Sequence, residues 1–424
     1  RKAALFVLNA YEDRGCRLKK AFQDAQHHYP GLTGADFRLA HEIAYGVVRY
    51  QLHLDWCLQE LLHRSRKKLD RSLRNILRIG LYQLRFLNRI PAYAAVNGCV
   101  ELARLVHQSA KSGFVNGVLR SYIRSSENIR WPDERTKFLS VYYSYPEPLV
   151  LRWLSNFGDE KTESLLERNN QRPFLGLRIN PEKTDRDGLV EKLKNSGIPV
   201  TLCEKNAAIV HVQSWTHIEN TQMYEEGLMQ VQDESALLPV HALNLEPHLM
   251  VLDLCAAPGG KTTAMAQLMH DQGMIVACDL SAKRLRILDA NKKRLDLHCI
   301  RTVAGDATNA SQWLKLSFDR ILVDAPCTNT GVLSRRIEAR WRFDNEYLRR
   351  MVQMQHKILT EALCLLRDGG LLVYSTCSID SAENGELVEK VISCFPNMRL
   401  IEQLSYFPDA CQDGGYWAKI QRII

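Results

Sequence analysis

The chain has 424 residues, 46% hydrophobic and 25% charged, which is typical of a globular protein with two or three domains. No apolar run approaches the roughly 20 residues of a membrane-spanning helix, and we expect a cytoplasmic protein. Its twelve cysteines contain no C-x-x-C pair. This spacing argues against a zinc site and a disulfide framework, so no metal is expected.

The net charge of +8 is unevenly distributed along the chain. Residues 1–130 carry 22 Lys and Arg against 10 Asp and Glu, a net of +12, so the remainder carries −4. Nine basic residues lie between Arg64 and Arg89, with Asp70 as the single acid among them. This asymmetry favours a polyanionic partner bound by the N-terminal third. A solvated helical surface would show the same composition.

Residues 1–130 are predicted to be helical throughout. Apolar residues recur at helical spacing over 36–50 and 73–84, and Pro91 ends the second of these helices. The apolar stripes are interpreted as core. The candidate contacts for the polyanionic partner are therefore the basic residues placed outside the stripes, which in the second helix are Arg71, Arg74, Arg78 and Arg85.

Residues 131–222 are predicted to form a small α+β module. A helix is expected over 149–157, strands over 175–180 and 208–212, and a second helix over 185–196. Four polar residues are possible contacts for the backbone of the polyanionic partner, and an ordinary turn or surface role is equally open for each of them. They are Asn169, Arg172, Arg178 and Asn180.

Residues 223–424 have the pattern of a doubly wound α/β domain. Five strands are expected, over 251–253, 274–279, 299–304, 318–324 and 370–376, with an antiparallel closing strand over 414–420. Ligands bind beyond the carboxyl ends of the strands in such sheets. Acids follow the first three strands and suit an adenosine-bearing cofactor. Cysteines follow the fourth and fifth strands and suit covalent chemistry.

The loop after the first strand is shaped for a ligand other than a triphosphate. Gly260-Lys261-Thr262 matches the end of a P-loop, but Cys255 stands where the first glycine must be. A side chain there would crowd the backbone nest that wraps phosphate. Asp279 lies roughly 20 residues past the glycines, where nucleotide-binding α/β domains place the carboxylate that holds a ribose.

Three motifs, Leu254–Thr262, Asp324–Cys327 and Ser375–Ser378, together resemble the S-adenosylmethionine-dependent RNA cytosine-5 methyltransferases. The whole chain is most similar to the bacterial Sun/Fmu (RsmB) type, which methylates small-subunit (16S) ribosomal RNA. The resemblance implies an all-α NusB-like RNA-binding domain over 1–130, a connecting α+β module over 131–222, and a Rossmann-like class I methyltransferase domain over 223–424. The NusB-like resemblance is carried by 44–49, 80–84 and 115–120.

The same resemblance implies that S-adenosyl-L-methionine is the cofactor. Asp279 would hold the ribose hydroxyls, Asp306 would lie near the adenine amino group, and Asp324 would border the methyl site, although each acid could instead cap a helix. Residues Gln232–Ser235 would cover the pocket, or simply begin a helix. The loop that would wrap the methionine and ribose comprises Cys255, Ala256, Ala257, Pro258, Gly259, Gly260 and Lys261.

Two cysteines compete for the role of nucleophile. C5 of cytosine becomes reactive when a thiolate adds to C6, after which C5 attacks the methyl group and a base removes the C5 proton. The RNA family uses the Thr-Cys cysteine, here Cys377, and the Pro-Cys cysteine, here Cys327, assists product release. DNA cytosine methyltransferases use a Pro-Cys nucleophile, which would select Cys327. Asp324 is expected to face N3 of the cytosine.

The sequence departs from the family after Cys327. Asn329 replaces a glycine where the backbone would need a positive φ, and asparagine is the next best residue for that conformation. The His-Pro-Asp stretch of the family is absent from Ser334–Trp341. The expected partner is small-subunit RNA, unassembled or early in assembly. Two alternatives stay open: methylation of transfer RNA, and an inactive RNA-binding or ribosome-assembly protein.

Overall fold

The computed structural model describes residues 1–14, 17–62, 69–107, 111–213 and 218–423, which form two compact units. The first unit comprises Arg1–Asn170 and Ile337–Arg342, and the second comprises Gln171–Arg336 and Phe343–Ile424. Within these described ranges, no helix combines the length and the apolar character needed to cross a membrane.

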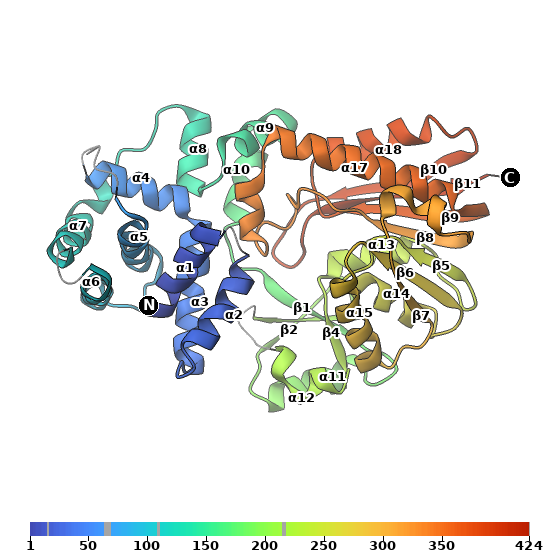
Figure 1. The fold of residues 1–424 in the computed structure, drawn as a ribbon, viewed down its shortest axis with the longest axis horizontal. Coiled ribbons are helices and arrows are strands. Elements are labelled where there is room, and N and C mark those ends of the chain that lie inside the picture. Colours follow the sequence, from blue (N-terminus) through green and yellow to red (C-terminus); the bar gives the residue numbers. More distant parts are fainter. Residues whose placement is uncertain (15–16, 63–68, 108–110, 214–217, 424) are drawn as a thin grey trace. The chain divides into compact units, whose positions relative to one another are not determined.

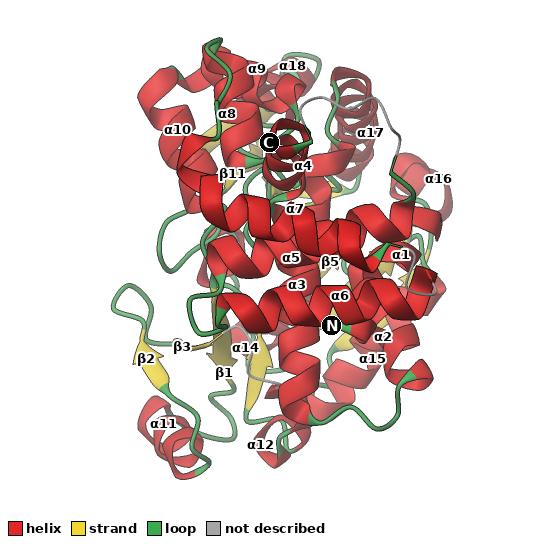
Figure 2. Cartoon of the chain, turned by 90° about the vertical axis from the view of Figure 1, so that its left-hand side faces the viewer, coloured by secondary structure: helices red, strands yellow, loops and turns green. Residues whose placement is uncertain are grey.

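The first unit consists of helices joined by loops (Figures 1 and 2), which confirms the predicted helical fold. Its longest buried stripe lies on α5, where Asp70 caps the helix by accepting a hydrogen bond from the Leu73 N–H at 2.9 Å. The helices are α1 (Lys2–Arg14), α2 (Leu18–His28), α3 (Gly34–Arg49), α4 (Gln51–Leu61), α5 (Arg71–Phe86), α6 (Ala92–His107), α7 (Ser112–Ser125), η1 (Ser126–Asn128), α8 (Arg135–Tyr143), α9 (Glu147–Phe157) and α10 (Asp159–Arg168).

One arginine that was expected to face outward is buried instead. The Arg78 side chain is only 3% exposed, and its guanidinium donates to both oxygens of Asp55, at 2.7 and 2.6 Å, and to Glu12 at 2.5 Å. Arg74 also donates to Glu12, at 3.1 Å. Part of the positive charge of α5 is therefore neutralised inside the unit. The prediction of Arg78 as an RNA contact was wrong, because its side chain is buried.

A short segment from far along the sequence completes the first unit. The 3₁₀ helix η5 (Ile337–Arg342) contributes Ile337 to the helical core. The Trp341 indole donates to the carbonyl of Val48 at 3.1 Å. Arg340 is fully buried, donates to Asn170 Oδ1 at 2.9 Å and stacks over the Tyr145 ring at 4.0 Å. These six residues are thus an integral part of a unit that otherwise ends at Asn170.

The second unit begins with a small antiparallel sheet in the order β2-β3-β1-β4. Strands β1 and β3 and helix α11 confirm the predicted elements, whereas the short edge strand β2 was not predicted. The elements are β1 (Phe174–Ile179), α11 (Arg186–Asn195), β2 (Val200–Leu202), β3 (Ile209–Gln213), η2 (Ile218–Asn220), α12 (Gln222–Glu225) and β4 (Met229–Val231).

Three of the four candidate RNA contacts in this part of the sequence are buried. Arg178 donates to Thr263 Oγ1 at 2.9 Å, and Asn180 donates to the carbonyl of Gly227 at 2.9 Å, so both side chains stabilise the second unit internally. Asn169 is buried in the first unit, where it donates to the carbonyl of Leu165. The interpretation of these three as RNA contacts was wrong. Arg172 is exposed and stays a candidate.

The rest of the second unit is a seven-stranded sheet in the order β10-β11-β9-β8-β5-β6-β7, in which β11 runs antiparallel to its neighbours β10 and β9 and the other six strands run in one direction. Strands β6 and β8 have the predicted limits. The elements are η3 (Glu234–Leu237), α13 (Leu238–Ala242), β5 (Met250–Asp253), α14 (Gly260–Leu268), β6 (Met274–Asp279), α15 (Ala282–Leu295), β7 (Ile300–Ala304), η4 (Ala307–Asn309), α16 (Ala310–Trp313), β8 (Phe318–Asp324), α17 (Asn345–Cys364), β9 (Leu366–Thr376), η6 (Ser381–Glu383), α18 (Gly385–Ile392), β10 (Met398–Tyr406) and β11 (Gly415–Arg422).

Helices cover both faces of this sheet, with α17 and α18 on one side and α13, α14 and α15 on the other (Figure 1). Alternate strand residues point to opposite faces. Ile321 and Val323 pack with α17, while Leu322 between them packs with α14 and α15. Because both faces are buried, the polar ends of the parallel strands are left to form a site at one edge of the sheet.

Candidate active site

The loop after β5 turns sharply into α14. Gly259 has a φ of 102°, and a Cβ there would come within 2.6 Å of the Leu288 side chain, so the turn requires glycine. Asp253, at the end of β5, is buried and accepts from Thr262 Oγ1 at 2.7 Å. Burial, with a smaller contribution from the neighbouring Asp324, raises the pKa of Asp253 to about 7. No described residue pairs with its second oxygen.

Asp279 and Asp306 follow the next two strands, as predicted. Asp279 ends β6, accepts from the Ala257 N–H at 3.2 Å and forms an ion pair with Arg284 at 3.1 Å, so it ties α15 to the Cys255–Lys261 loop. Asp306 is exposed and caps η4 by accepting from the Thr308 N–H at 2.9 Å. The capping alternative is therefore confirmed for Asp306, while the cofactor roles of both acids stay predictions.

Asp324, at the end of β8, lies between the Cys255–Lys261 loop and β9. Its Oδ2 accepts from Lys261 Nζ at 2.6 Å, and its Oδ1 accepts from Ser375 Oγ at 3.1 Å. Lys261, which in a P-loop would reach for phosphate, is thus committed to a carboxylate. This ion pair joins the first of the three motifs to the second, and the serine joins the second to the third.

The two candidate nucleophiles lie side by side. Cys327 Sγ and Cys377 Sγ are 3.2 Å apart, and both are free thiols. Cys327 is 5% exposed and Cys377 is more open. The hydrogen bond between the thiols, together with burial, raises the pKa of Cys327 well above its ordinary value. The same bond lowers the pKa of Cys377, and the nearby Arg336 and Lys261 lower it further.

Asn329 connects both cysteine loops. Its φ of 64° confirms the positive φ expected at this position. Its Nδ2 donates to the carbonyl of Cys327 at 2.7 Å, and its Oδ1 accepts from Cys377 Sγ at 3.3 Å and from Arg336 Nη1 at 2.8 Å. The glycine-to-asparagine replacement predicts the backbone conformation of Asn329 but not the contacts of its side chain.

Glu383 is a buried carboxylate that accepts hydrogen bonds from both cysteine-bearing loops, and the sequence did not predict this role. It accepts hydrogen bonds from the Thr328 N–H at 2.9 Å, from Ser378 Oγ at 2.5 Å and from Gln355 Nε2 at 2.8 Å. Thr328 follows Cys327 and Ser378 follows Cys377, so one side chain fixes both cysteine-bearing turns. A glutamate in the first turn of a helix gave no signal of this role.

The segment Gln232–Ser235 lies next to the Cys255–Lys261 loop. Asp233 caps η3 by accepting from the Ser235 N–H at 3.0 Å, which confirms the alternative of a helix start. A Cβ on Gly260 would lie 3.6 Å from Gln232 Nε2, so this amide faces the start of α14. That proximity supports the expected cover over the pocket, which stays a prediction.

Comparison with known proteins agrees with this architecture. The family described as 16S rRNA methyltransferase RsmB/F matches residues 240–414, the NusB family matches 1–124, and a ferredoxin-like domain of the RsmF/B-like methyltransferases matches 145–219. A probable ribosomal RNA small subunit methyltransferase B from Synechocystis is 36% identical, covering 92% of this chain and 88% of the relative. The Vibrio vulnificus ribosomal RNA small subunit methyltransferase B is 34% identical, with 95% and 92% covered.

Solved structures show the same fold. A crystal structure titled PH0851 superposes with a TM-score of 0.84 at 23% identity, covering 100% of this chain and 99% of that chain. NSun6 from Pyrococcus horikoshii, solved with SFG, has a TM-score of 0.61 at 21% identity, with 66% and 99% covered.

The helical NusB-like domain, the ferredoxin-like module and the Rossmann-like sheet with its strand-end loops define an RNA methyltransferase architecture. Within that class, the chain belongs to the ribosomal RNA small subunit methyltransferase B family.

Proposed function

We propose that this protein transfers a methyl group from S-adenosyl-L-methionine to C5 of a cytidine in small-subunit (16S) ribosomal RNA through a covalent cysteine adduct. The observation that carries the proposal is the thiol pair at the ends of β8 and β9, in which one sulfur is biased toward the thiolate and the other toward the thiol. A nucleophile and a separate proton donor are what formation and cleavage of such an adduct require.

Cys377 is the proposed nucleophile. Its thiolate forms a bond to C6 of the cytosine, which places negative charge on the ring and makes C5 nucleophilic. C5 takes the methyl group, a base removes the C5 proton, and the sulfur leaves with the electrons of the C6 bond. Cys327 keeps its proton at neutral pH and touches the sulfur of Cys377, so it can assist this last step. Asp324 accepts a hydrogen bond from Ser375, two residues before Cys377, and is the proposed contact to N3.

The residues at the strand ends fit the proposed cofactor. When bound, S-adenosylmethionine supplies an electrophilic methyl group on a sulfonium that carries positive charge. Three carboxylates surround the loop that would receive it, namely Asp253, Asp279 and Asp324, and the buried Asp253 has an oxygen that no described residue satisfies. The proposed binding residues are Cys255–Lys261, Asp279, Asp306 and Asp324.

The substrate assignment is supported by the relatives named as small subunit methyltransferases, two of which are described above. Methylation of transfer RNA and an inactive RNA-binding role are the alternatives. The full chain would be incubated with tritiated S-adenosylmethionine and one RNA substrate at a time. The substrates are protein-free 16S RNA, assembled small subunits and transfer RNA. Labelled RNA would then be digested to nucleosides.

We expect label in 16S RNA, recovered as 5-methylcytidine. Label in transfer RNA alone, or label at another nucleoside, would overturn the proposed substrate or the proposed chemistry. Cofactor binding without incorporation into any of the three RNAs would favour the inactive RNA-binding protein.

A further inference from the structure

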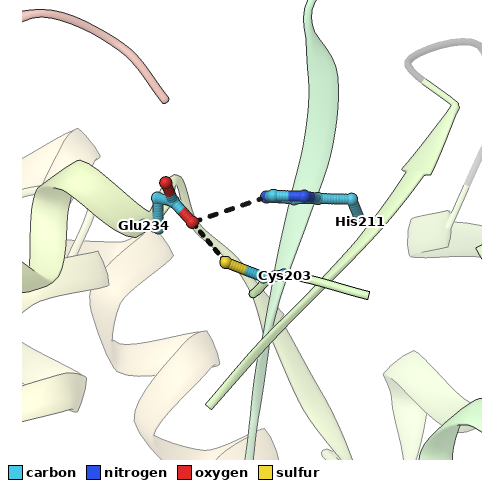
Figure 3. A group of neighbouring side chains, drawn as sticks. All are labelled: Cys203, His211 and Glu234. Carbon is cyan, nitrogen blue, oxygen red and sulfur yellow. Dashed lines mark hydrogen bonds and ion pairs between the residues drawn. The ribbon is translucent and has the colours of Figure 1, made fainter. Parts of the chain in front are cut away.

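Three side chains of different chemistry meet inside the second unit, in a group that the proposed methyl transfer does not use. Cys203 follows β2, His211 lies within β3 and Glu234 begins η3, and each is at most 4% exposed. Figure 3 shows the imidazole and the thiol pointing at the same carboxylate oxygen. Glu234 Oε2 lies 2.5 Å from Cys203 Sγ and 3.9 Å from His211 Nε2.

The polar atoms of this group are poorly satisfied. Neither ring nitrogen of His211, nor Oε1 of Glu234, has a hydrogen-bond partner among the described residues. Burial lowers the pKa of His211, so the imidazole is neutral at neutral pH and offers no cation to the carboxylate. Lys205, a nearby cation, donates to Asp409 at 2.7 Å. Buried polar atoms without partners cost free energy, and a buried carboxylate without a cation costs more.

A divalent transition metal would satisfy all of these groups together. Thiolate, imidazole and carboxylate are the ligands that Zn²⁺ takes in proteins, and all the potential ligand atoms lie within 4.8 Å of one another. With the thiol proton lost, the ligands carry two negative charges, which a dication neutralises. The ligands come from three separate elements, which explains why cysteine spacing predicted no metal.

We propose that Cys203, His211 and Glu234 form a binding site for a divalent transition metal of the Zn²⁺ type. Metal binding releases the Cys203 proton, because the thiolate is the form that ligates a metal, so affinity falls as the pH falls. Thiolate and carboxylate ligands of a tetrahedral ion lie about 3.5 Å apart. The Glu234 carboxylate would therefore turn slightly away from the sulfur.

The proposed metal would have a structural role close to the cofactor loop. Glu234 belongs to the segment Gln232–Ser235, in which Gln232 faces Gly260 and Asp233 forms an ion pair with Arg335 at 2.5 Å. A metal bound to Glu234 would anchor this segment to β2 and β3 of the small sheet. The three ligands leave room in a tetrahedral set for a water molecule. This proposal is independent of the reaction proposed above.

The test uses the full chain without an affinity tag, stripped of metal by a chelator and then titrated with Co²⁺. Cobalt replaces Zn²⁺ at such sites, and a charge-transfer band in the near ultraviolet reports a thiolate ligand. We expect one Co²⁺ per chain, a sulfur-to-cobalt band, displacement by Zn²⁺, and release of one proton per metal. Cys203→Ser and Glu234→Gln are nearly isosteric and should each weaken binding at least tenfold. Cys394→Ser, which removes an exposed thiol of the same unit, should bind like the wild type.

The paired thiols are the competing source of a cobalt–sulfur band, so Cys377→Ala is titrated in parallel. A band that persists in Cys203→Ser and disappears in Cys377→Ala would overturn the proposal, as would the lack of any band in the wild-type chain. If the Cys203→Ser chain does not fold, the wild-type and Cys377→Ala titrations still decide between the two sites. Retention of the full band by Cys377→Ala, with Zn²⁺ raising the melting temperature, would support the proposed site.

Discussion

The loops after β8 and β9 carry the same functional group in two different environments. Cys327 follows β8, is nearly sealed from solvent, and its pKa is raised. Cys377 follows β9, is more open, and its pKa is lowered by the neighbouring thiol and by Arg336 and Lys261. Neighbouring parallel strands place both sulfurs at one sheet edge, but the loops decide which sulfur has the lower pKa. Position on the fold and chemical role are thus set by different residues.

Removing each sulfur in turn tests whether the two cysteines have different roles, and it has the largest expected effect. Cys377→Ala should reduce methyl transfer by at least about a thousandfold, because it removes the proposed nucleophile. Cys327→Ala should also lose turnover, but it should accumulate RNA that stays attached to protein on a denaturing gel. The reverse pattern, with adduct in Cys377→Ala, would make Cys327 the nucleophile.

Removing the carboxylate that holds both loops should affect stability as well as activity. Glu383→Ala leaves the Thr328 N–H, Ser378 Oγ and Gln355 Nε2 without their shared acceptor, and we expect a loss of about 3 kcal/mol in the free energy of unfolding. Urea unfolding measures this change. The control Glu386→Ala removes a neighbouring glutamate from the first turn of α18. Equal stability of the two variants would remove Glu383 from its proposed role.

The difference in ionisation can be measured without RNA. Because the pKa of Cys377 is lowered, its alkylation by iodoacetamide should increase with pH earlier than that of an ordinary thiol, and Cys327 should react later. Arg336→Gln removes a neighbouring positive charge and should shift the Cys377 profile to higher pH. Arg399→Gln, on the exposed side of β10, is the control. Mass spectrometry of the labelled peptides separates the two thiols. An unchanged profile in Arg336→Gln would show that this guanidinium does not stabilise the thiolate.

The smallest expected effects come from Asn329, which holds a left-handed backbone conformation between the thiols. Asn329→Ala should lose about 1 kcal/mol in the free energy of unfolding. Alanine is strained at positive φ by its Cβ and lacks the polar side chain that lets asparagine adopt this conformation. Asn329→Gly should keep the backbone relaxed and lose only the side-chain bonds to Cys327, Cys377 and Arg336. Thermal unfolding compares the two. If alanine were as stable as glycine, backbone strain would not explain the residue at this position.

Local pattern was sufficient to predict much of the fold. The limits of β6 and β8 follow from apolar runs that end in an acid, and the helices of the first unit follow from stripes of period 3.6. The order of motifs at successive strand ends then predicted which side chains meet at the sheet edge. Asn329 shows how far such reasoning reaches, since its backbone conformation followed from a single replacement of glycine.

The errors share one physical cause, which is that burial depends on partners distant in sequence. Arg78 has the spacing of a surface residue and is buried because Glu12 and Asp55 neutralise it. Arg178 lies on a strand whose alternation does not reveal that α14 covers it. For the same reason, the sequence did not predict the role of Glu383, the group around Glu234 or the edge strand β2. No local period encodes contacts that only the tertiary fold creates.

The six residues of η5 have a consequence for how the protein is made. The helical unit incorporates Ile337 and Arg340, yet the rest of that unit ends at Asn170. A ribosome that adds about 5–20 residues per second needs on the order of 10–30 s to pass from one point to the other. During that interval the nascent helical unit lacks part of its core. A chain cut at residue 170 would keep that gap permanently, so dissecting the protein at this boundary should yield a helical fragment with a lower melting temperature than the same unit in the full chain.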